Sequence, residues 1–142
     1  MASSNSPLAP ETQAVAQAYA ALNRNDVAAF VKDFDPQVER IEPADFPGNG
    51  IYLGVEAVMA HVRHHRGNWA EGSCAPQRFI AAGDKVVALV DVNVRLQHET
   101  EWRQGRVVDV FTFRNGKVVQ FRTFFDQQQG LQWAGVDASE AT

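Results

Sequence analysis

The sequence predicts an α+β fold in which a curved antiparallel sheet wraps around N-terminal helices. Apolar residues recur with helical spacing in the first half of the chain, and from residue 75 onward they alternate as they do in strands. The segment GRVVDVFTFRNGKVVQFRTFFD, residues 105–126, contains the strongest hairpin signal. A curved sheet with helices across its concave side encloses a cone. We therefore expect a cone-shaped pocket wherever side chains do not fill that space.

Composition restricts the class of protein. A chain of 142 residues is long enough for one domain with a core and too short for two. The formal net charge is −4 and the basic residues form no stripe, so nucleic acid is not an expected partner. The single cysteine, Cys74, excludes an internal disulfide framework. The first nine residues lack the features of a signal peptide, and no stretch could span a bilayer. We expect a water-soluble cytoplasmic protein without a membrane partner.

The first half of the chain predicts three helices, near residues 11–22, 27–34 and 54–67. Each has apolar residues spaced by three and four positions, which places them on one helix face. Asn23-Arg24-Asn25 separates the first two helices, and Asp35-Pro36 ends the second, because the residue before a proline avoids helical dihedrals. A short strand is expected at 38–43, and a loop rich in glycine and proline follows it at 45–50.

The second half predicts four antiparallel strands, at 75–82 and 86–96 and in the two arms of the 105–126 hairpin. We expect one domain at 10–133, with a disordered tail at 1–9 and a C-terminal tail at 134–142. One short helical turn is expected at 127–133 before the polar chain end frays.

Asp109 is the residue in the hairpin that packing does not explain, because it lies in an apolar run and an unpaired buried charge is costly. The turn allows two registers. A two-residue loop, Asn115-Gly116, would place Asp109 opposite Arg122, and an ion pair would explain it. A three-residue loop would place it opposite Phe121 and make it the one ionisable group on an apolar face. The second register divides apolar from polar residues better and is favoured.

Several segments resemble the nuclear transport factor 2 superfamily and, within it, the ketosteroid-isomerase-like and SnoaL-like proteins. The resemblance covers roughly residues 11–130, and it implies a cystatin-like α+β roll that dimerises through the outer face of its sheet. The segments that carry it are Ala20-Ala21-Leu22-Asn23, Asp26, Phe34, Ile41-Glu42-Pro43, Tyr52-Leu53-Gly54-Val55-Glu56-Ala57-Val58, Val108-Asp109-Val110-Phe111-Thr112-Phe113 and Gly116-Lys117-Val118-Val119.

The resemblance implies catalytic roles for Glu42 and Asp109. Glu42 stands where ketosteroid isomerases keep their base, and Asp109 stands where they keep a protonated aspartic acid that hydrogen-bonds the substrate oxyanion. Ala18 takes the place of their tyrosine, so Tyr19 is expected to point elsewhere on the helix. Limonene epoxide hydrolases and SnoaL-type polyketide cyclases keep an acid where this chain has Thr123, which gives those two chemistries little support.

The sequence therefore favours cofactor-free proton transfer on a small apolar carbonyl compound, by an isomerase or a related lyase or cyclase. Two alternatives stay open: a non-catalytic protein that binds an apolar metabolite, and a dimeric interaction scaffold with a filled cone. For Asp109 the alternative is an ion pair with Arg122 or Arg106, and for Glu42 it is a solvated position on an edge strand. A homodimer is expected in each case.

The remaining site predictions concern a ligand pocket and a group of histidines. The residues expected to contact the ligand are Tyr19, Phe30, Phe34, His61, Val90, Val92, Phe111, Phe121, Thr123 and Phe125, although aromatic residues at such spacing also form ordinary cores. His61 and His65 lie four residues apart and could share a metal ion. No third ligand is evident, so a solvated helix end is favoured, and no metal or cofactor is predicted.

Overall fold

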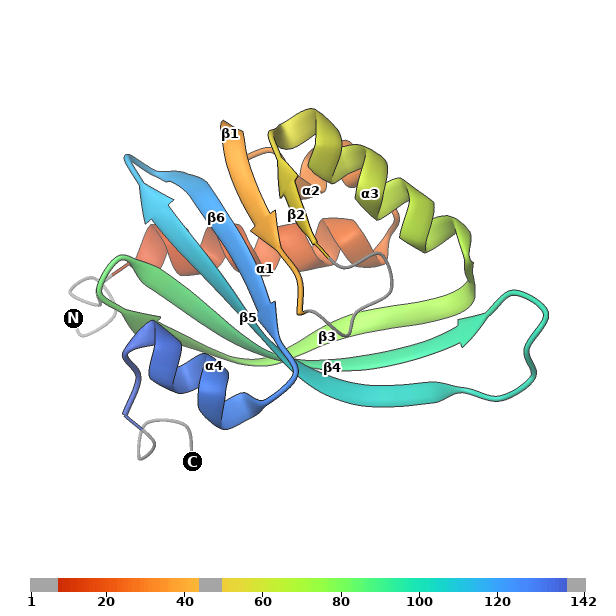
Figure 1. Cartoon of the computed structure of the whole chain (residues 1–142). Helices are drawn as coiled ribbons and strands as arrows, with labels where there is room; N and C mark the ends of the chain where they lie inside the picture. Colours follow the sequence, from red (N-terminus) through yellow and green to blue (C-terminus); the bar gives the residue numbers. More distant parts are fainter. Residues whose placement is uncertain (1–7, 44–49, 138–142) are drawn as a thin grey trace.

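The computed structural model describes residues 8–43 and 50–137 and has α+β architecture (Figure 1). The elements are α1 (Ala9–Asn23), α2 (Val27–Phe30), β1 (Phe34–Ile41), β2 (Ile51–Leu53), α3 (Val55–Gly67), β3 (Trp69–Ala82), β4 (Lys85–Leu96), β5 (Arg103–Arg114), β6 (Lys117–Phe124) and α4 (Gln127–Ala134). The strands form one curved sheet in the order β2-β1-β6-β5-β4-β3. The predicted fold class is therefore confirmed.

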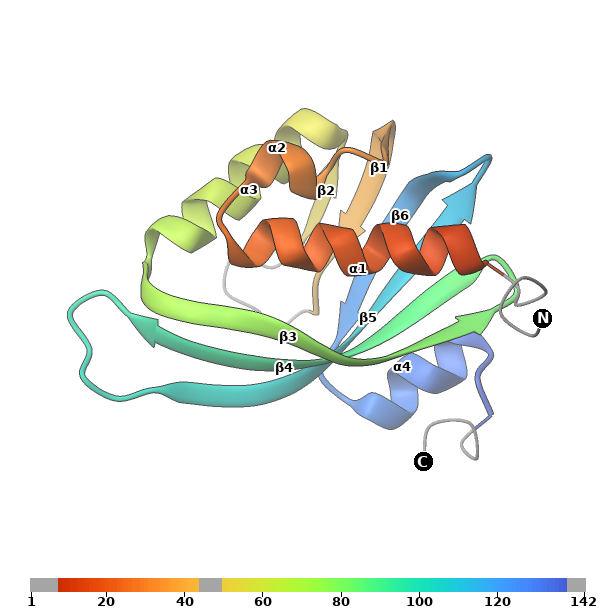
Figure 2. The same cartoon turned by 180° about the vertical axis from the view of Figure 1, so that it is seen from behind.

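Helices cover both faces of this sheet. In Figures 1 and 2, α1, α2 and α3 lie across the concave face and α4 lies against the opposite face. Each layer has its own core. The larger core joins Val15 and Tyr19 of α1 to Phe111 of β5, and the smaller one joins Leu131 of α4 to Val108. Any site inside the roll is thus enclosed by the larger core.

The second helix was predicted over residues 27–34, and its C-terminal half is not helical. Only Val27–Phe30 is helical, with the Asp26 side chain accepting a hydrogen bond from the Ala29 N–H at 3.1 Å. The chain then turns, and β1 already begins at Phe34. A helical turn followed by a strand buries the same apolar residues that the helical spacing had grouped. The spacing therefore predicted burial correctly and the backbone conformation wrongly.

Strand β1 extends the sheet beyond the predicted antiparallel set. It pairs in parallel with β6 and antiparallel with β2, a strand that the sequence did not predict. Inward-facing residues alternate along β1, so that Val38 and Arg40 lie on the buried side of the sheet. Glu42 follows with the same alternation and is also buried. This strand therefore directs two charged side chains into the molecule.

The two-residue-loop register is correct beside the turn, where Arg114 pairs with Lys117, but neither predicted register holds at Asp109. Asn115 and Gly116 form a two-residue turn with φ of 53° and 79°, as a type I′ turn requires. The register then shifts between Phe113 and Thr112, which leaves one extra residue in β6. Because of this bulge, Asp109 pairs with Thr123 instead of with an arginine or a phenylalanine.

The chain after β6 is more ordered than expected. Asp126 caps α4 by accepting a hydrogen bond from the Gln129 N–H at 2.9 Å, and Gly135 ends the helix with φ of 82°. Leu131 and Val136 are buried against the outer face of the sheet. The helix therefore adds a second core where a fraying end was predicted, and packing continues past residue 133.

Candidate functional site

Asp109 lies on the concave face of β5 and is enclosed by two hydroxyl groups. Its exposed fraction is 6%. The Thr123 hydroxyl donates to Asp109 Oδ1 at 2.5 Å, and the Tyr19 hydroxyl donates to Asp109 Oδ2 in a short hydrogen bond. The expectation that Tyr19 points elsewhere is wrong. Ala18 and Tyr19 are both buried because α1 lies broadside on the sheet, and the longer tyrosine side chain reaches the carboxyl group.

Burial governs the protonation of this group. Loss of solvent raises the pKa of the Asp109 carboxyl above its ordinary value, while the Arg40 guanidinium and the hydrogen bonds from Thr123 and Tyr19 lower it. The pKa is raised on balance. Burial and the neighbouring carboxylate also raise the pKa of the Tyr19 phenol well above its usual range. Asp109 is therefore held toward the neutral acid and Tyr19 remains a hydrogen-bond donor.

Arg40 is a buried residue of the site that the sequence did not predict. Its Nη1 donates to the carbonyl oxygens of Ile41 at 3.1 Å and of Phe121 at 3.3 Å, and its guanidinium lies 3.9 Å from the centre of the Phe121 ring. Burial lowers the pKa of Arg40, and the charges of Asp109 and Glu42 oppose that effect. The alternation of β1 was the available signal, since Arg40 shares its face with Val38.

Glu42 lies beside both Arg40 and a histidine of α3. Its Oε2 is 3.5 Å from Arg40 Nη2 and 2.9 Å from His61 Nε2. The residue is 8% exposed, so the solvated position considered for it is wrong. Its other oxygen, Oε1, has no hydrogen-bond partner among residues 8–43 and 50–137. One carboxylate oxygen therefore lies beside basic groups, and the other is buried without a hydrogen-bond partner among these residues.

The end of α3 brings two histidines to this carboxylate. His61 stacks on Tyr52 with ring centres 3.8 Å apart, and His65 meets His61 edge to face at 4.3 Å. Partial burial and the neighbouring His61 lower the pKa of His65. One ligand atom from each of Glu42, His61 and His65 lies within 4.8 Å of the other two. The third potential metal ligand, which the sequence did not reveal, is thus Glu42.

The structure brings most of the predicted ligand-contacting residues together, but as a packed core. Val90 and the aromatic rings of Phe30, Phe34, Phe111 and Phe121 are buried, and Val92 is partly buried against them. The rings of Phe111 and Phe121 stack with centres 4.4 Å apart. Phe125, in contrast, is 47% exposed.

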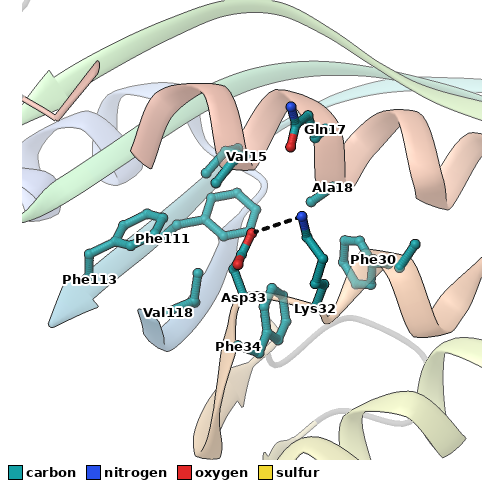
Figure 3. Close-up of a pocket in the computed structure, with 12 residues that line it drawn as sticks. Val15, Gln17, Ala18, Phe30, Lys32, Asp33, Phe34, Phe111, Phe113 and Val118 are labelled. Carbon is teal, nitrogen blue, oxygen red and sulfur yellow. Dashed lines mark ion pairs between the residues drawn. The ribbon is translucent and has the colours of Figure 1, made fainter. Parts of the chain in front are cut away.

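An apolar hollow lies between helices α1 and α2 and the sheet (Figure 3). Its volume is about 20 Å³, which is room for roughly one water molecule. Phe30 and Phe34 line it on one side and Phe111 on the other. Lys32 and Asp33 lie at its edge, with Lys32 Nζ 4.0 Å from Asp33 Oδ2. Glu42 and Asp109 do not line this hollow. The carboxyl groups and this hollow are therefore separate features of the described residues.

Comparison with known proteins agrees with the observed fold. Residues 15–121 match the family model of the SnoaL-like domain. The chain therefore belongs to the SnoaL-like family, within the nuclear transport factor 2-like superfamily. The search of curated proteins finds no match.

Three solved structures illustrate the likeness. An NTF2-like protein from Burkholderia thailandensis is 30% identical, with a TM-score of 0.74 over 85% of this chain and 96% of that one. An NTF2-like protein of unknown function from Burkholderia pseudomallei is 27% identical, with a TM-score of 0.73 over 86% and 95%. TerC, co-crystallised with polyporic acid, is 23% identical, with a TM-score of 0.74 over 89% and 98%.

Within the described part of the chain, no helix is both long enough and apolar enough to cross a bilayer.

Proposed function

We propose that this protein is a cofactor-free proton-transfer enzyme of the isomerase type, acting on a small, largely apolar carbonyl compound. The observation that carries the proposal is the presence of two buried carboxyl groups in contrasting environments. Glu42 lies beside the cationic Arg40, whereas the pKa of Asp109 is raised by burial. Two carboxyl groups with separated environments can serve as base and acid at the same pH.

Glu42 is the base in this proposal. Its Oε1 has no hydrogen-bond partner among the described residues and is the atom that would take a proton from the carbon next to the carbonyl group. Arg40 donates a hydrogen bond to Oε2 at 3.5 Å and so orients the carboxylate, and His61 Nε2 lies 2.9 Å from the same oxygen. The same proton is returned to the conjugated carbon further along, so the reaction consumes no co-reactant.

Asp109 is the acid, and it stabilises the charge that develops on the carbonyl oxygen. A protonated carboxyl group that is shielded from water is a strong donor to an enolate. Tyr19 and Thr123 support it, because their hydroxyl groups contact its two oxygens and can reorient when the acid donates its proton.

A small organic ligand is consistent with the comparison that involves TerC, whose structure was obtained with polyporic acid. That structure is 23% identical and establishes the fold alone. The proposal that the substrate is a carbonyl compound is based on Glu42 and Asp109 alone.

Binding without catalysis is the second candidate function, and one observation favours it. Both oxygens of Asp109 are already occupied by hydroxyl groups of the chain itself. If these contacts persist with ligand present, Asp109 serves the stability of the fold. The protein would then bind an apolar metabolite, or act as a dimeric scaffold, without transferring a proton.

The proposal is tested by exchanging Glu42→Gln in the full chain. The probe is a cyclic β,γ-unsaturated ketone, whose conversion to the conjugated ketone is followed by ultraviolet absorbance, while NMR in D₂O follows exchange of its acidic protons. Loss of a general base is expected to lower the rate at least about 100-fold. Binding of the conjugated ketone, titrated by NMR, should change little because the amide keeps the shape of the carboxylate.

Glu39→Gln is the matched control. Glu39 lies on β1, and its side chain accepts a hydrogen bond from Gln120 at 2.8 Å, away from Arg40 and His61. It should retain the wild-type rate. Wild-type activity in Glu42→Gln would remove Glu42 from the mechanism, and ketone binding without any turnover by the wild-type protein would favour the binding function.

A further inference from the structure

We infer that Glu42, His61 and His65 form a binding site for one divalent transition-metal ion of the zinc class. The three side chains come from two elements that are distant in sequence. His61 and His65 are one helical turn apart on α3, and Glu42 follows β1. Helical spacing alone supplied two ligands, and the fold adds a carboxylate beside them.

The separation of Glu42 and His61 is that of neighbouring metal ligands. Bonds from zinc to imidazole nitrogen or carboxylate oxygen are about 2.0–2.2 Å long, so two ligands at right angles lie roughly 3 Å apart. Glu42 Oε2 and His61 Nε2 are 2.9 Å apart. The ligand atoms of all three residues lie within 4.8 Å of one another. Binding would therefore require the third ligand to move closer by up to about 2 Å, and His65, which is less buried than Glu42, can supply this movement.

The local hydrogen bonding also leaves room for an ion. Despite the 2.9 Å separation, His61 Nε2 and Glu42 Oε2 are not aligned as a hydrogen bond, and the nitrogen has no such partner within 8–43 and 50–137. Glu42 Oε1 likewise has none in that part of the chain. A buried polar atom without a partner destabilises a fold. A metal ion bound by His61 Nε2 and by both oxygens of the Glu42 carboxylate would give each of these two buried atoms a partner.

The ligand chemistry selects the class of ion. Two imidazoles and one carboxylate form the set used by zinc and by non-haem iron, with further positions left for water. Calcium and magnesium prefer sites made of oxygen atoms alone. Arg40, with Nη2 at 3.5 Å from Glu42 Oε2, repels a cation and lowers the affinity. The site is therefore expected to bind less tightly than a closed four-ligand zinc site.

This inference does not depend on the proposed proton transfer. A metal ion on Glu42 would occupy the proposed base, so added Zn²⁺ is expected to inhibit ketone isomerisation. Metal binding is measured directly, in protein that is free of metal and without any ketone. Failure of the catalytic proposal would leave this measurement intact, and the reverse is also true.

The test uses untagged full-length protein, with Co²⁺ as an optical probe and Zn²⁺ in calorimetry. One ion per chain is expected, with visible Co²⁺ absorption bands. His65→Gln and Glu42→Gln should each weaken binding by at least about tenfold. His64→Gln is the matched control. His64 adjoins His65 on α3, is exposed and does not belong to the ligand group, so this variant should bind as wild type does.

Circular dichroism of each variant separates a lost ligand from a lost fold. The inference is overturned if correctly folded His65→Gln and Glu42→Gln proteins bind Co²⁺ as tightly as wild type. It is also overturned if His64→Gln weakens binding as much as His65→Gln does, because surface histidines would then hold the ion. Absence of binding by the wild-type protein would overturn it as well.

Discussion

The carboxyl group of Asp109 lies among neighbours that shift its pKa in opposite directions. Burial raises the pKa, while Arg40 and the two hydroxyl donors lower it, with burial prevailing. A group whose pKa is raised in the folded state stabilises the fold below its unfolded pKa, about 3.9 for aspartate, and loses that contribution as pH rises to the folded value. The direction in which stability changes with pH can therefore be tested directly.

Replacing Asp109→Asn should remove this pH dependence. The free energy of unfolding of the wild type, minus that of the variant, is expected to fall as pH rises from about 4. It should fall by at most about 1.4 kcal/mol per pH unit and level off above the folded pKa. Urea unfolding of both proteins at a series of pH values measures the difference, from which groups common to both cancel.

The opposite slope would contradict the balance described here. If the difference grows as pH rises over the same range, Arg40 outweighs burial and Asp109 is ionised in the folded protein. The offset between the two proteins is a separate quantity. It reports the altered hydrogen bonds to Tyr19 and Thr123 and should not vary with pH.

Individual residues of the site were predicted unevenly by the sequence. Asp109 was found because a carboxyl group in an apolar strand requires an explanation, whereas Glu42 was found only through the family resemblance. Arg40 was missed although the alternation of β1 indicated it. The contact between Tyr19 and Asp109 could not be predicted, because it depends on how α1 lies across the sheet.

At the scale of elements, helix α4 is fixed to the sheet by close backbone approach. A methyl group on Gly130 would lie 2.9 Å from Val108 Cγ1 and 3.2 Å from Phe124 Cβ. Such contacts are too short, so either the helix or the strands would have to move. The absence of a side chain at this position therefore allows the second core to form.

Gly130→Ala is accordingly expected to destabilise the protein by about 1–3 kcal/mol, although alanine favours helices. Gly67→Ala in α3 is the control, because nothing lies within 4 Å of the added methyl group. That variant should be neutral or stabilise the fold by up to about 1 kcal/mol. Both values come from urea unfolding, and equal stability of the two variants would show that α4 does not pack as described.

In the hairpin, the position of the turn was predicted from the sequence but the pairing of the strands was not. The residues Asn115 and Gly116 identified the turn correctly, since both have positive φ. The extra residue in β6 has no local sequence signal, because it depends on how β6 pairs with β1 as well as with β5. The residue that pairs with Asp109 could therefore be identified only from the structure of the whole sheet.

At the scale of the molecule, exposed apolar residues gather on the outer side of the sheet edge. Leu53 of β2 is 67% exposed and Ile51 is 60% exposed. Leu53 also lines a surface hollow with Val119 and with Trp133, which is partly exposed. Apolar surface of this kind suits an interface between copies of the chain, and the homodimer stays a prediction.

A Leu53→Asp variant is expected to convert a dimer into a monomer of 15.7 kDa, because a carboxylate would be buried at the interface. Light scattering coupled to gel filtration measures the mass. Trp102→Asp is the control, since Trp102 is exposed between β4 and β5, far along the chain from β2. A monomeric wild-type protein, or a Leu53→Asp variant that remains dimeric, would contradict this prediction.

The enclosed guanidinium of Arg40 has a consequence for anything taken up nearby. Burial lowers the pKa of Arg40 while the charges of Asp109 and Glu42 raise it, so the charge of the guanidinium is coupled to both acids. Water cannot screen a further charge there. Uptake of a charged guest is therefore expected to exchange protons with the surrounding buffer, whereas an uncharged ketone would enter without altering the proton count.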